Sequence, residues 1–229
     1  MKRSTVVAIV LCILSVGYGR TAAAQPSPAF GPGRIEVALG AVWIGQLALG
    51  SNDANETTPT GGNLRIFTTS TDLSSVAGLE ARVAVRLLQS LEAEVEGSYG
   101  TPRLNVTISS DIENAPRVTA TESVQQYTVG AGVVWYVPLH LASSRLAPFV
   151  SGGGGHLRQV HEAQTVVDTG QYYHVGGGLK WLLFARPRGP VNAVGLRVDA
   201  RAVVRVKGVA FDDGGHASPA VGASAFIRF

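Results

Sequence analysis

The chain has very little of the chemistry that cross-links small secreted domains. Only one of its 229 residues is cysteine, Cys12, so an intrachain disulfide and a cysteine-ligated zinc site are both excluded. Charged residues make up only 15% of the chain, and the 45% that is apolar excludes an intrinsically disordered chain. No stretch after residue 24 is apolar over the roughly 20 residues that a transmembrane helix needs.

The N-terminal segment has the three parts of a secretory signal peptide. A basic start at residues 1–3 precedes an apolar run over residues 5–16. Residues 21–24, TAAA, supply the small side chains of a cleavage site. We therefore expect residues 1–24 to be a signal peptide that directs the chain across the inner membrane.

Removal of this segment changes the charge of the chain. Residues 1–24 hold three basic residues and no acidic one, so 19 − 3 = 16 basic residues remain against 16 acidic residues. A neutral chain lacks the basic face that nucleic acid requires, and we expect no nucleic-acid partner. Residues 25–33, with three prolines, are predicted to be a flexible lead-in, and residues 34–229 a single domain.

Eight segments alternate apolar and polar side chains with a period of two, which indicates β-strands. Most are near the 9–11 residues of a tilted strand that crosses a membrane. The segments are Arg34–Gly45, Gly78–Leu87, Leu91–Tyr99, Gln126–Trp135, Leu146–Val160, His174–Trp181, Val194–Arg205 and Val221–Phe229.

The connections between these segments alternate in length. Polar and mostly long connections span 46–77, 109–117, 161–169 and 207–217, and shorter ones span 88–90, 138–144 and 184–193. Long loops at one end and short turns at the other are typical of outer-membrane barrels. Residues 51–63 form the clearest loop. The length of the first connection leaves a ten-strand variant open, with Leu64–Thr69 in an extra strand.

One face of the eight segments is almost uncharged, whereas the other carries six acidic and six basic residues. In a soluble sandwich these charges would face water, but in a membrane barrel they fill the lumen while the apolar face meets lipid. Equal numbers allow pairing, which buried charges need. We predict a lumen charge network, with Arg228 left aside at the chain end. Its members are Glu36, Glu80, Arg82, Arg86, Glu92, Glu94, Glu96, Lys180, Arg197, Asp199, Arg201 and Arg205.

Aromatic residues favour the membrane barrel over the sandwich. They fall near both ends of the predicted strands, as in the two aromatic bands of a spanning barrel. The predicted girdle consists of Trp43, Tyr99, Tyr127, Trp135, Phe149, Tyr173 and Trp181.

Four features together resemble the small outer-membrane β-barrel proteins of Gram-negative bacteria, the OmpA/OmpX-like group. They are the signal peptide, the hairpin GLEARVAVRLLQSLEAEVEGSYG at 78–100, the strand LAPFVSGGGG at 146–155, and the final AFIRF. The resemblance implies an all-β, transmembrane, antiparallel up-and-down β-barrel of eight strands in the cell outer membrane. It also implies a monomer without cofactor, in contact with outer-membrane lipid and lipopolysaccharide. Ile227 and Phe229 would then form the signal that the barrel-assembly machinery recognises.

The resemblance implies a structural or surface-interaction role, with a narrow channel for small solutes or ions as the alternative. A lipid A-modifying enzyme is a second alternative, because His216-Ala217-Ser218 is similar to the His-x-Ser of outer-membrane lipid A deacylases. That family has asparagine where this chain has Pro219, and we predict no catalytic residue and no enzyme activity. Metal binding would need more ligands than His156, His161, His174 and Glu162 offer.

Overall fold

The computed structural model describes residues 35–57, 61–110, 116–138, 145–161, 167–186, 189–208 and 215–229. The predicted signal peptide and lead-in lie outside the described residues. Within the described ranges the chain is all β, and no helix there is long and apolar enough to cross a membrane.

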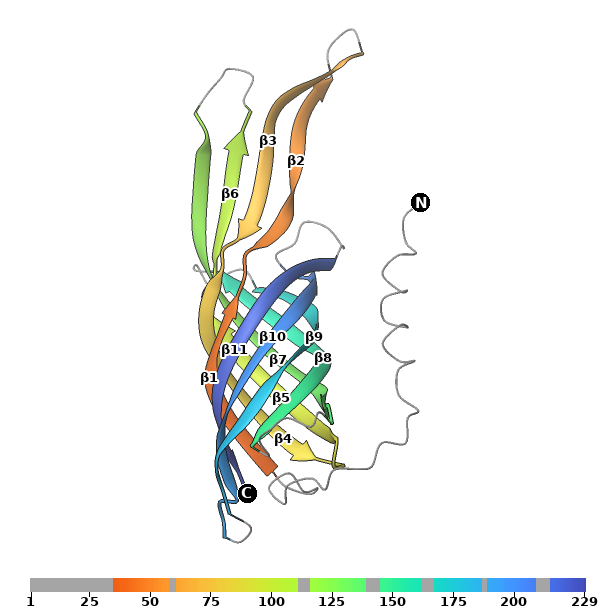
Figure 1. Cartoon of the computed structure of the whole chain (residues 1–229). Helices are drawn as coiled ribbons and strands as arrows, with labels where there is room; N and C mark the ends of the chain where they lie inside the picture. Colours follow the sequence, from red (N-terminus) through yellow and green to blue (C-terminus); the bar gives the residue numbers. More distant parts are fainter. Residues whose placement is uncertain are drawn as a thin grey trace, which may run out of the picture.

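Eight strands close into an antiparallel up-and-down barrel (Figure 1). Each strand pairs with the next in the chain order of the set, and the last, β11, pairs with β1. The barrel strands are β1 (Ile35–Ile44), β4 (Val76–Arg86), β5 (Leu91–Gly100), β7 (Val118–Tyr136), β8 (Leu146–His161), β9 (Val167–Ala185), β10 (Ala193–Lys207) and β11 (Gly215–Arg228). All eight predicted strands are confirmed, and so is the fold that the family resemblance implies.

Three further strands project beyond one end of the barrel (Figure 1). β2 (Leu47–Thr57), β3 (Asn63–Leu73) and β6 (Arg103–Ser109) pair in the order β2-β3-β6, and β6 pairs with residues 118–123 of β7. We call β2, β3, β6 and residues 118–123 the extension. Short breaks at 45–46, 74–75 and 101–102 separate its first three strands from the barrel strands that they continue.

The extension corrects the sequence prediction in two respects. The connection 46–77 is not a long loop, because β2 and β3 occupy most of it, and residues 51–57 are strand. The ten-strand variant is wrong as well, since residues 64–69 belong to β3, which lies outside the closed barrel. Most of β2 is exposed on both faces, so its side chains show little of the apolar alternation that marks a half-buried strand.

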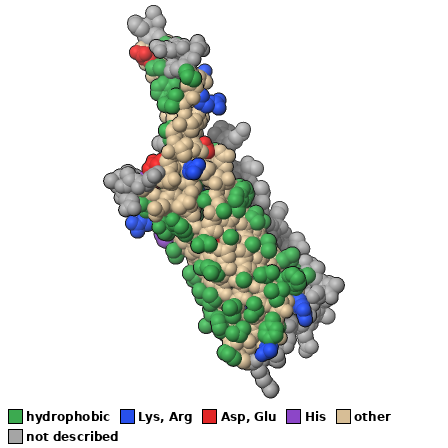
Figure 2. All heavy atoms as spheres, turned by 90° about the vertical axis from the view of Figure 1, so that its left-hand side faces the viewer, with side chains coloured by type: hydrophobic (Ala, Val, Ile, Leu, Met, Phe, Trp, Pro, Cys, Tyr) green, Lys and Arg blue, Asp and Glu red, His purple; other side chains and the backbone are tan. Residues whose placement is uncertain are grey.

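The outer surface of the barrel is apolar. Residues such as Leu39 and Leu79 expose 65% and 64% of their surface, and apolar side chains cover the barrel wall in the space-filling view (Figure 2). Charged side chains are instead seen at the two ends and on the extension (Figure 2). A wide apolar band around a closed barrel is the surface that a membrane-spanning barrel presents to lipid.

The barrel interior has an apolar cluster at each end. The cluster at the short-turn end contains Ala38, Val134, Tyr136, Phe149, Leu182, Ala193 and Phe226. The cluster where the barrel meets the extension contains Leu47, Leu49, Leu73, Leu104 and Val124. The charged residues of the lumen begin within the first cluster, where Arg86 and Lys180 lie over the Tyr136 ring, and continue toward the second.

Candidate functional site

The twelve predicted lumen charges all lie on the inner face of the barrel. Each exposes at most 7% of its surface. They come from β1, β4, β5, β9 and β10, where alternate residues point inward and place every second side chain in the lumen. The structure adds Arg228, which the sequence analysis left aside, and which is also buried.

The layer nearest the short turns centres on one ammonium group. Lys180 Nζ donates to Glu36 Oε1 at 2.6 Å and to Glu92 Oε1 at 2.7 Å. The Arg228 guanidinium pairs with Glu36, and the Tyr136 hydroxyl donates to Glu92 at 2.7 Å. Each carboxylate in this layer therefore has a cation and a second donor.

The middle layer centres on Asp199. Its Oδ1 accepts from Arg82 at 2.9 Å and from Arg197 at 3.1 Å, and its Oδ2 lies 2.9 Å from Arg201 Nε. Arg197 also pairs with Glu94 on the opposite wall. Three guanidinium groups on one carboxylate link β4 and β10 across the lumen.

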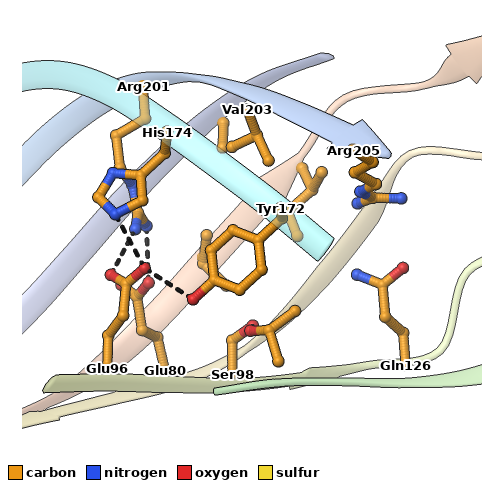
Figure 3. Close-up of a pocket in the computed structure, with 13 residues that line it drawn as sticks. Glu80, Glu96, Ser98, Gln126, Tyr172, His174, Arg201, Val203 and Arg205 are labelled. Carbon is orange, nitrogen blue, oxygen red and sulfur yellow. Dashed lines mark hydrogen bonds and ion pairs between the residues drawn. The ribbon is translucent and has the colours of Figure 1, made fainter. Parts of the chain in front are cut away.

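The upper layer centres on Glu96 and Glu80 (Figure 3). Arg201 donates to Glu80 at 2.7 Å and to Glu96 at 3.1 Å. Glu96 also accepts from the Tyr172 hydroxyl at 3.0 Å, and His174 Nε2 lies 3.1 Å from it. Neither aromatic partner was part of the predicted network. The sequence pattern could have identified both residues, because Tyr172 and His174 fall on the same alternating face of β9 as Lys180.

The two remaining predicted charges have different surroundings. Arg86 donates from Nε to the Leu88 carbonyl oxygen at 3.3 Å, and its guanidinium carbon lies 4.0 Å from the centre of the Tyr136 ring. Arg205 makes no ion pair or hydrogen bond with any described residue, and its Nη1 is buried without a partner. The structure thus joins ten of the twelve charges in ion pairs. It holds Arg86 through the Leu88 carbonyl oxygen and the Tyr136 ring, and leaves Arg205 without an ion pair to any described residue.

Two small cavities lie at the extension end of the lumen, and Arg205 borders both. The first lies against the upper layer, where Glu96, Tyr172 and Gln126 form part of its wall (Figure 3). The second is lined by four leucines and by four polar residues. These residues are Leu47, Leu49, Leu73, Leu157, Gln159, Arg205, Lys207 and His216.

The predicted girdle is exposed on the outer surface at six of its seven positions. Phe149 is the exception, and its assignment to the girdle is wrong. It exposes 2% of its surface and lies in the lumen, with the Arg197 guanidinium carbon 4.6 Å from its ring centre. The alternation of β8 points Val150 outward and so turns Phe149 inward. The six exposed residues are Trp43, Tyr99, Tyr127, Trp135, Tyr173 and Trp181.

The histidines considered for a metal site are dispersed. His156 is exposed on the outer face of β8, and His174 is in the lumen. His161 lies beyond the girdle, where its ring nitrogens are 3.0 Å from Glu122 and 3.1 Å from Asp168. Glu162 lies outside the described residues, and among those described no group of three or more His, Cys, Asp or Glu could hold a metal ion.

The His161 cluster has a defined electrostatic effect. Burial disfavours the imidazolium, but the hydrogen bonds to Glu122 and Asp168 outweigh it and raise the pKa of His161 above its usual 6.5. The cluster joins β7, β8 and β9 at the rim of the barrel.

The start and the end of β11 (Gly215–Arg228) place the predicted residues on different faces of the barrel. His216 borders the second cavity and Ser218 is buried, so both lie on the lumen side and not on the lipid side where a lipid A substrate would lie. Ile227 and Phe229 are exposed on the outer surface. The Phe229 backbone N–H donates to the Ile35 carbonyl oxygen at 2.9 Å, next to the pairing of β1 with β11.

Comparison with known proteins finds similar structures but no similar sequence. No protein-family model matches the chain, and no curated protein matches it. Neisserial surface protein A is 13% identical, with 85% of this chain and 95% of that chain covered and a TM-score of 0.48. The outer membrane protein OprG from Pseudomonas aeruginosa is 10% identical, with coverage of 87% and 98% and a TM-score of 0.49. Ail of Yersinia pestis is 14% identical, with coverage of 86% and 99% and a TM-score of 0.41.

The class of this protein is defined by its own geometry. Closed antiparallel pairing of eight strands, an apolar outer surface and a charged interior together describe a transmembrane β-barrel. Within this barrel the lumen holds layers of paired charges, and the extension continues beyond one end.

Proposed function

We propose that this protein is an outer-membrane barrel of a Gram-negative bacterium that is closed to solutes and anchors its extension at the cell surface. The signal peptide expected from the sequence and the apolar barrel wall support this location. In this proposal the barrel is a monomer in contact with outer-membrane lipid and lipopolysaccharide. The barrel-assembly machinery inserts it and recognises Ile227 and Phe229.

The filled lumen is the observation that carries the closed state. Three layers of ion pairs follow one another along the barrel, from Glu36 to Glu96, and every carboxylate in them contacts at least one cation. A solute crossing this region would have to separate buried partners, which is costly in a low-dielectric interior. Charges paired in this way act as a plug and not as the lining of a water-filled pore.

The extension supports the surface role. Its strands are held together by polar side chains as well as by backbone pairing: Thr68 donates to Asp53 at 2.6 Å, and Thr121 donates to Asn105 at 3.0 Å. Most of its β2 residues are exposed. It continues the barrel at the end with the longer connections, which faces outward in outer-membrane barrels. A hydrophilic sheet in this position suits contact with ligands or neighbouring surfaces.

The narrow channel remains the second candidate because of the cavity against Glu96 and Tyr172. Single-channel recording in a planar bilayer separates the two functions. The wild-type protein should first show the heat-dependent mobility on an SDS gel that is expected of a closed barrel. We expect protein that passes this check to give no steady conductance. A steady, ion-selective conductance would overturn the closed state, and identical mobility before and after boiling would overturn the barrel itself.

A further inference from the structure

An arginine lies on the lipid-facing wall of the barrel. Arg158 of β8 is exposed, whereas its neighbours Leu157 and Gln159 are buried on the lumen side. It pairs in register with Tyr127 of β7, which pairs in turn with Tyr99 of β5. The two tyrosines are exposed girdle residues, and their ring centres lie 5.0 Å apart. Because aromatic girdles mark the membrane interface, Arg158 lies at the height of the lipid headgroups.

The position of Arg158 determines which anion it can meet. An arginine on the lipid face of a barrel is strongly disfavoured at the bilayer midplane and is tolerated at the interface. Its planar fork of N–H groups matches a lipid phosphate there. Among the described residues of β5, β7 and β8, no Asp or Glu shares this outer face. The β5 carboxylates are buried in the lumen, and Glu122 of β7 contacts His161 at the rim. A lipid phosphate is therefore the anion that this wall is placed to meet.

A second arginine lies on the same outer face, closer to the tip of the extension. Arg103 of β6 is exposed and pairs in register with Ser123, four residues from Tyr127 on β7. In the space-filling view, Lys or Arg side chains are seen where the apolar wall meets the extension (Figure 2). Four strand residues span about 13 Å, or about 10 Å along the barrel axis at the usual strand tilt. The face thus carries two cations at different heights.

Hydrogen-bonding side chains occupy this face between and beyond the two arginines. Between them lies Gln125, whose side chain accepts from the Tyr127 hydroxyl at 3.1 Å. Beyond them Thr121 donates to Asn105 at 3.0 Å, and Asn105 donates to Asp72 at 3.3 Å. Hydroxyl, amide and carboxylate groups are the partners that sugar hydroxyls need, because they both donate and accept hydrogen bonds.

The height of this face distinguishes between two kinds of anionic lipid. The headgroup region on each side of a bilayer is only about 5–8 Å thick. A phospholipid with its phosphate on Arg158 would therefore end short of Arg103, about 10 Å farther along the axis. A lipid whose headgroup is a phosphorylated saccharide is tall enough to meet both arginines and the polar side chains around them.

We propose that the outer wall over β6, β7 and β8 binds one molecule of lipopolysaccharide. A phosphate of the lipid lies on Arg158, the acyl chains lie against the apolar wall below it, and the phosphorylated saccharide reaches Gln125 and Arg103. This site rests on the proposed outer-membrane location. It deepens that proposal, because it assigns the lipopolysaccharide to one defined face of the barrel.

Binding of rough lipopolysaccharide, which has a short saccharide, to the full-length protein in detergent micelles tests the site. Native mass spectrometry over a titration gives the stoichiometry and the affinity. We expect one tightly held molecule per barrel. Arg158→Gln and Arg103→Gln should each weaken binding by about fivefold, the effect of one arginine at a charged lipid headgroup. Both side chains are exposed, so both variants should keep the heat-dependent gel mobility of the wild type.

Arg65→Gln is the matched control. Arg65 is exposed on β3 in the extension, where it lies 4.0 Å from Asp53, and its loss should leave binding unchanged. Phosphatidylglycerol provides the comparison with a short headgroup. It should bind more weakly than lipopolysaccharide, and its binding should depend on Arg158 but not on Arg103.

Two results would overturn the proposal at different points. Lipopolysaccharide that binds equally to wild type and Arg158→Gln would overturn the site itself. Equal binding to wild type and Arg103→Gln, or phosphatidylglycerol that binds as tightly as lipopolysaccharide, would overturn the assignment of a lipid with a saccharide headgroup. The proposed closed state is tested separately, because a steady conductance would overturn it and leave the measured binding as it is.

Discussion

Arg201 donates from Nη2 to Glu80 Oε1 at 2.7 Å across the lumen, although 121 positions separate the two residues in the chain. The same guanidinium contacts Glu96 and Asp199. One side chain therefore holds three carboxylates, which come from β4, β5 and β10, and connects opposite walls of the barrel.

Loss of this guanidinium should destabilise the barrel strongly. We expect Arg201→Ala to lower the free energy of unfolding by about 3–5 kcal/mol, the cost of leaving buried partners unpaired. Val198→Ala, on the lipid-facing side of the same strand, should cost only about 1 kcal/mol from lost apolar contact. Urea unfolding midpoints in lipid vesicles measure both. A small effect of Arg201→Ala, together with an altered conductance, would favour a water-filled channel over a plug.

Two glycines in the barrel wall should respond differently to alanine. A Cβ at Gly130 would lie 2.7 Å from the Gly154 carbonyl oxygen and still nearer the Tyr172 hydroxyl, which donates to Glu96. Gly130→Ala should therefore displace Tyr172 and cost about 1–3 kcal/mol, as overpacking does. A Cβ at Gly97 meets only the Thr128 carbonyl oxygen, at 3.5 Å.

Gly97→Ala serves as the control and should change stability by no more than about 0.5 kcal/mol. Urea unfolding of both variants in vesicles gives the comparison. Equal effects of the two substitutions would contradict the close packing of Tyr172 against β7.

The rim of the barrel should lose local stability as pH rises. The pKa of His161 is raised in the folded protein. The stability that protonated His161 adds to the fold is therefore complete below the usual pKa of 6.5, and it is lost as pH rises through the raised pKa. Hydrogen exchange of the rim amides of β7, β8 and β9 should therefore show weaker protection at pH 9 than at pH 6, after correction for intrinsic exchange rates. His161→Gln should remove this dependence, and an unchanged pH profile in that variant would exclude His161 as its source.

The absence of cysteine after Cys12 provides a direct test of orientation. Asn55→Cys places a thiol on the exposed part of β2 in the extension, and Gln89→Cys places one in an exposed short turn at the other end. A membrane-impermeant maleimide should label Asn55→Cys on intact cells and Gln89→Cys only after lysis. The opposite pattern would place the extension in the periplasm and reject the proposed surface role.

Phe229 should affect assembly more than the stability of the finished barrel. Its side chain is exposed, and its backbone contributes one hydrogen bond to Ile35. Deletion of Phe229 should lower the amount of protein in the outer membrane and increase its degradation in the periplasm. Unfolding of the purified variant should change little. An undiminished yield in cells would contradict a role in assembly.

The barrel was predictable because one physical rule governs it. Each of the eight strands separates lipid from lumen, so its side chains alternate, and the alternation is visible in residues such as Glu92, Glu94 and Glu96. The pairing of those charges was not predictable in detail. The pairing depends on which inward residues lie at the same level along the barrel axis. The register between strands sets that level, and it brings Arg197 and Glu94 together.

The extension and two side chains needed the structure. β2 and β3 carry little periodic signal because water contacts both faces of much of their length. Phe149 resembles a girdle residue in sequence, since it lies near a strand end, but the phase of β8 turns it inward. Arg228 lies in the inward register of β11 and pairs with Glu36, a contact between residues 192 positions apart.

The breaks in the strands give the molecule a mechanical asymmetry. β2, β3 and β6 are each interrupted before they continue into the barrel, whereas β7 runs without interruption from Val118 to Tyr136. We therefore expect a force on the extension to be transmitted mainly along the continuous backbone of β7. The three interrupted connections should bend more easily. Tension from a bound surface would reach the barrel along β7, whose inner side contacts Glu92 through Tyr136 at the far end of the plug.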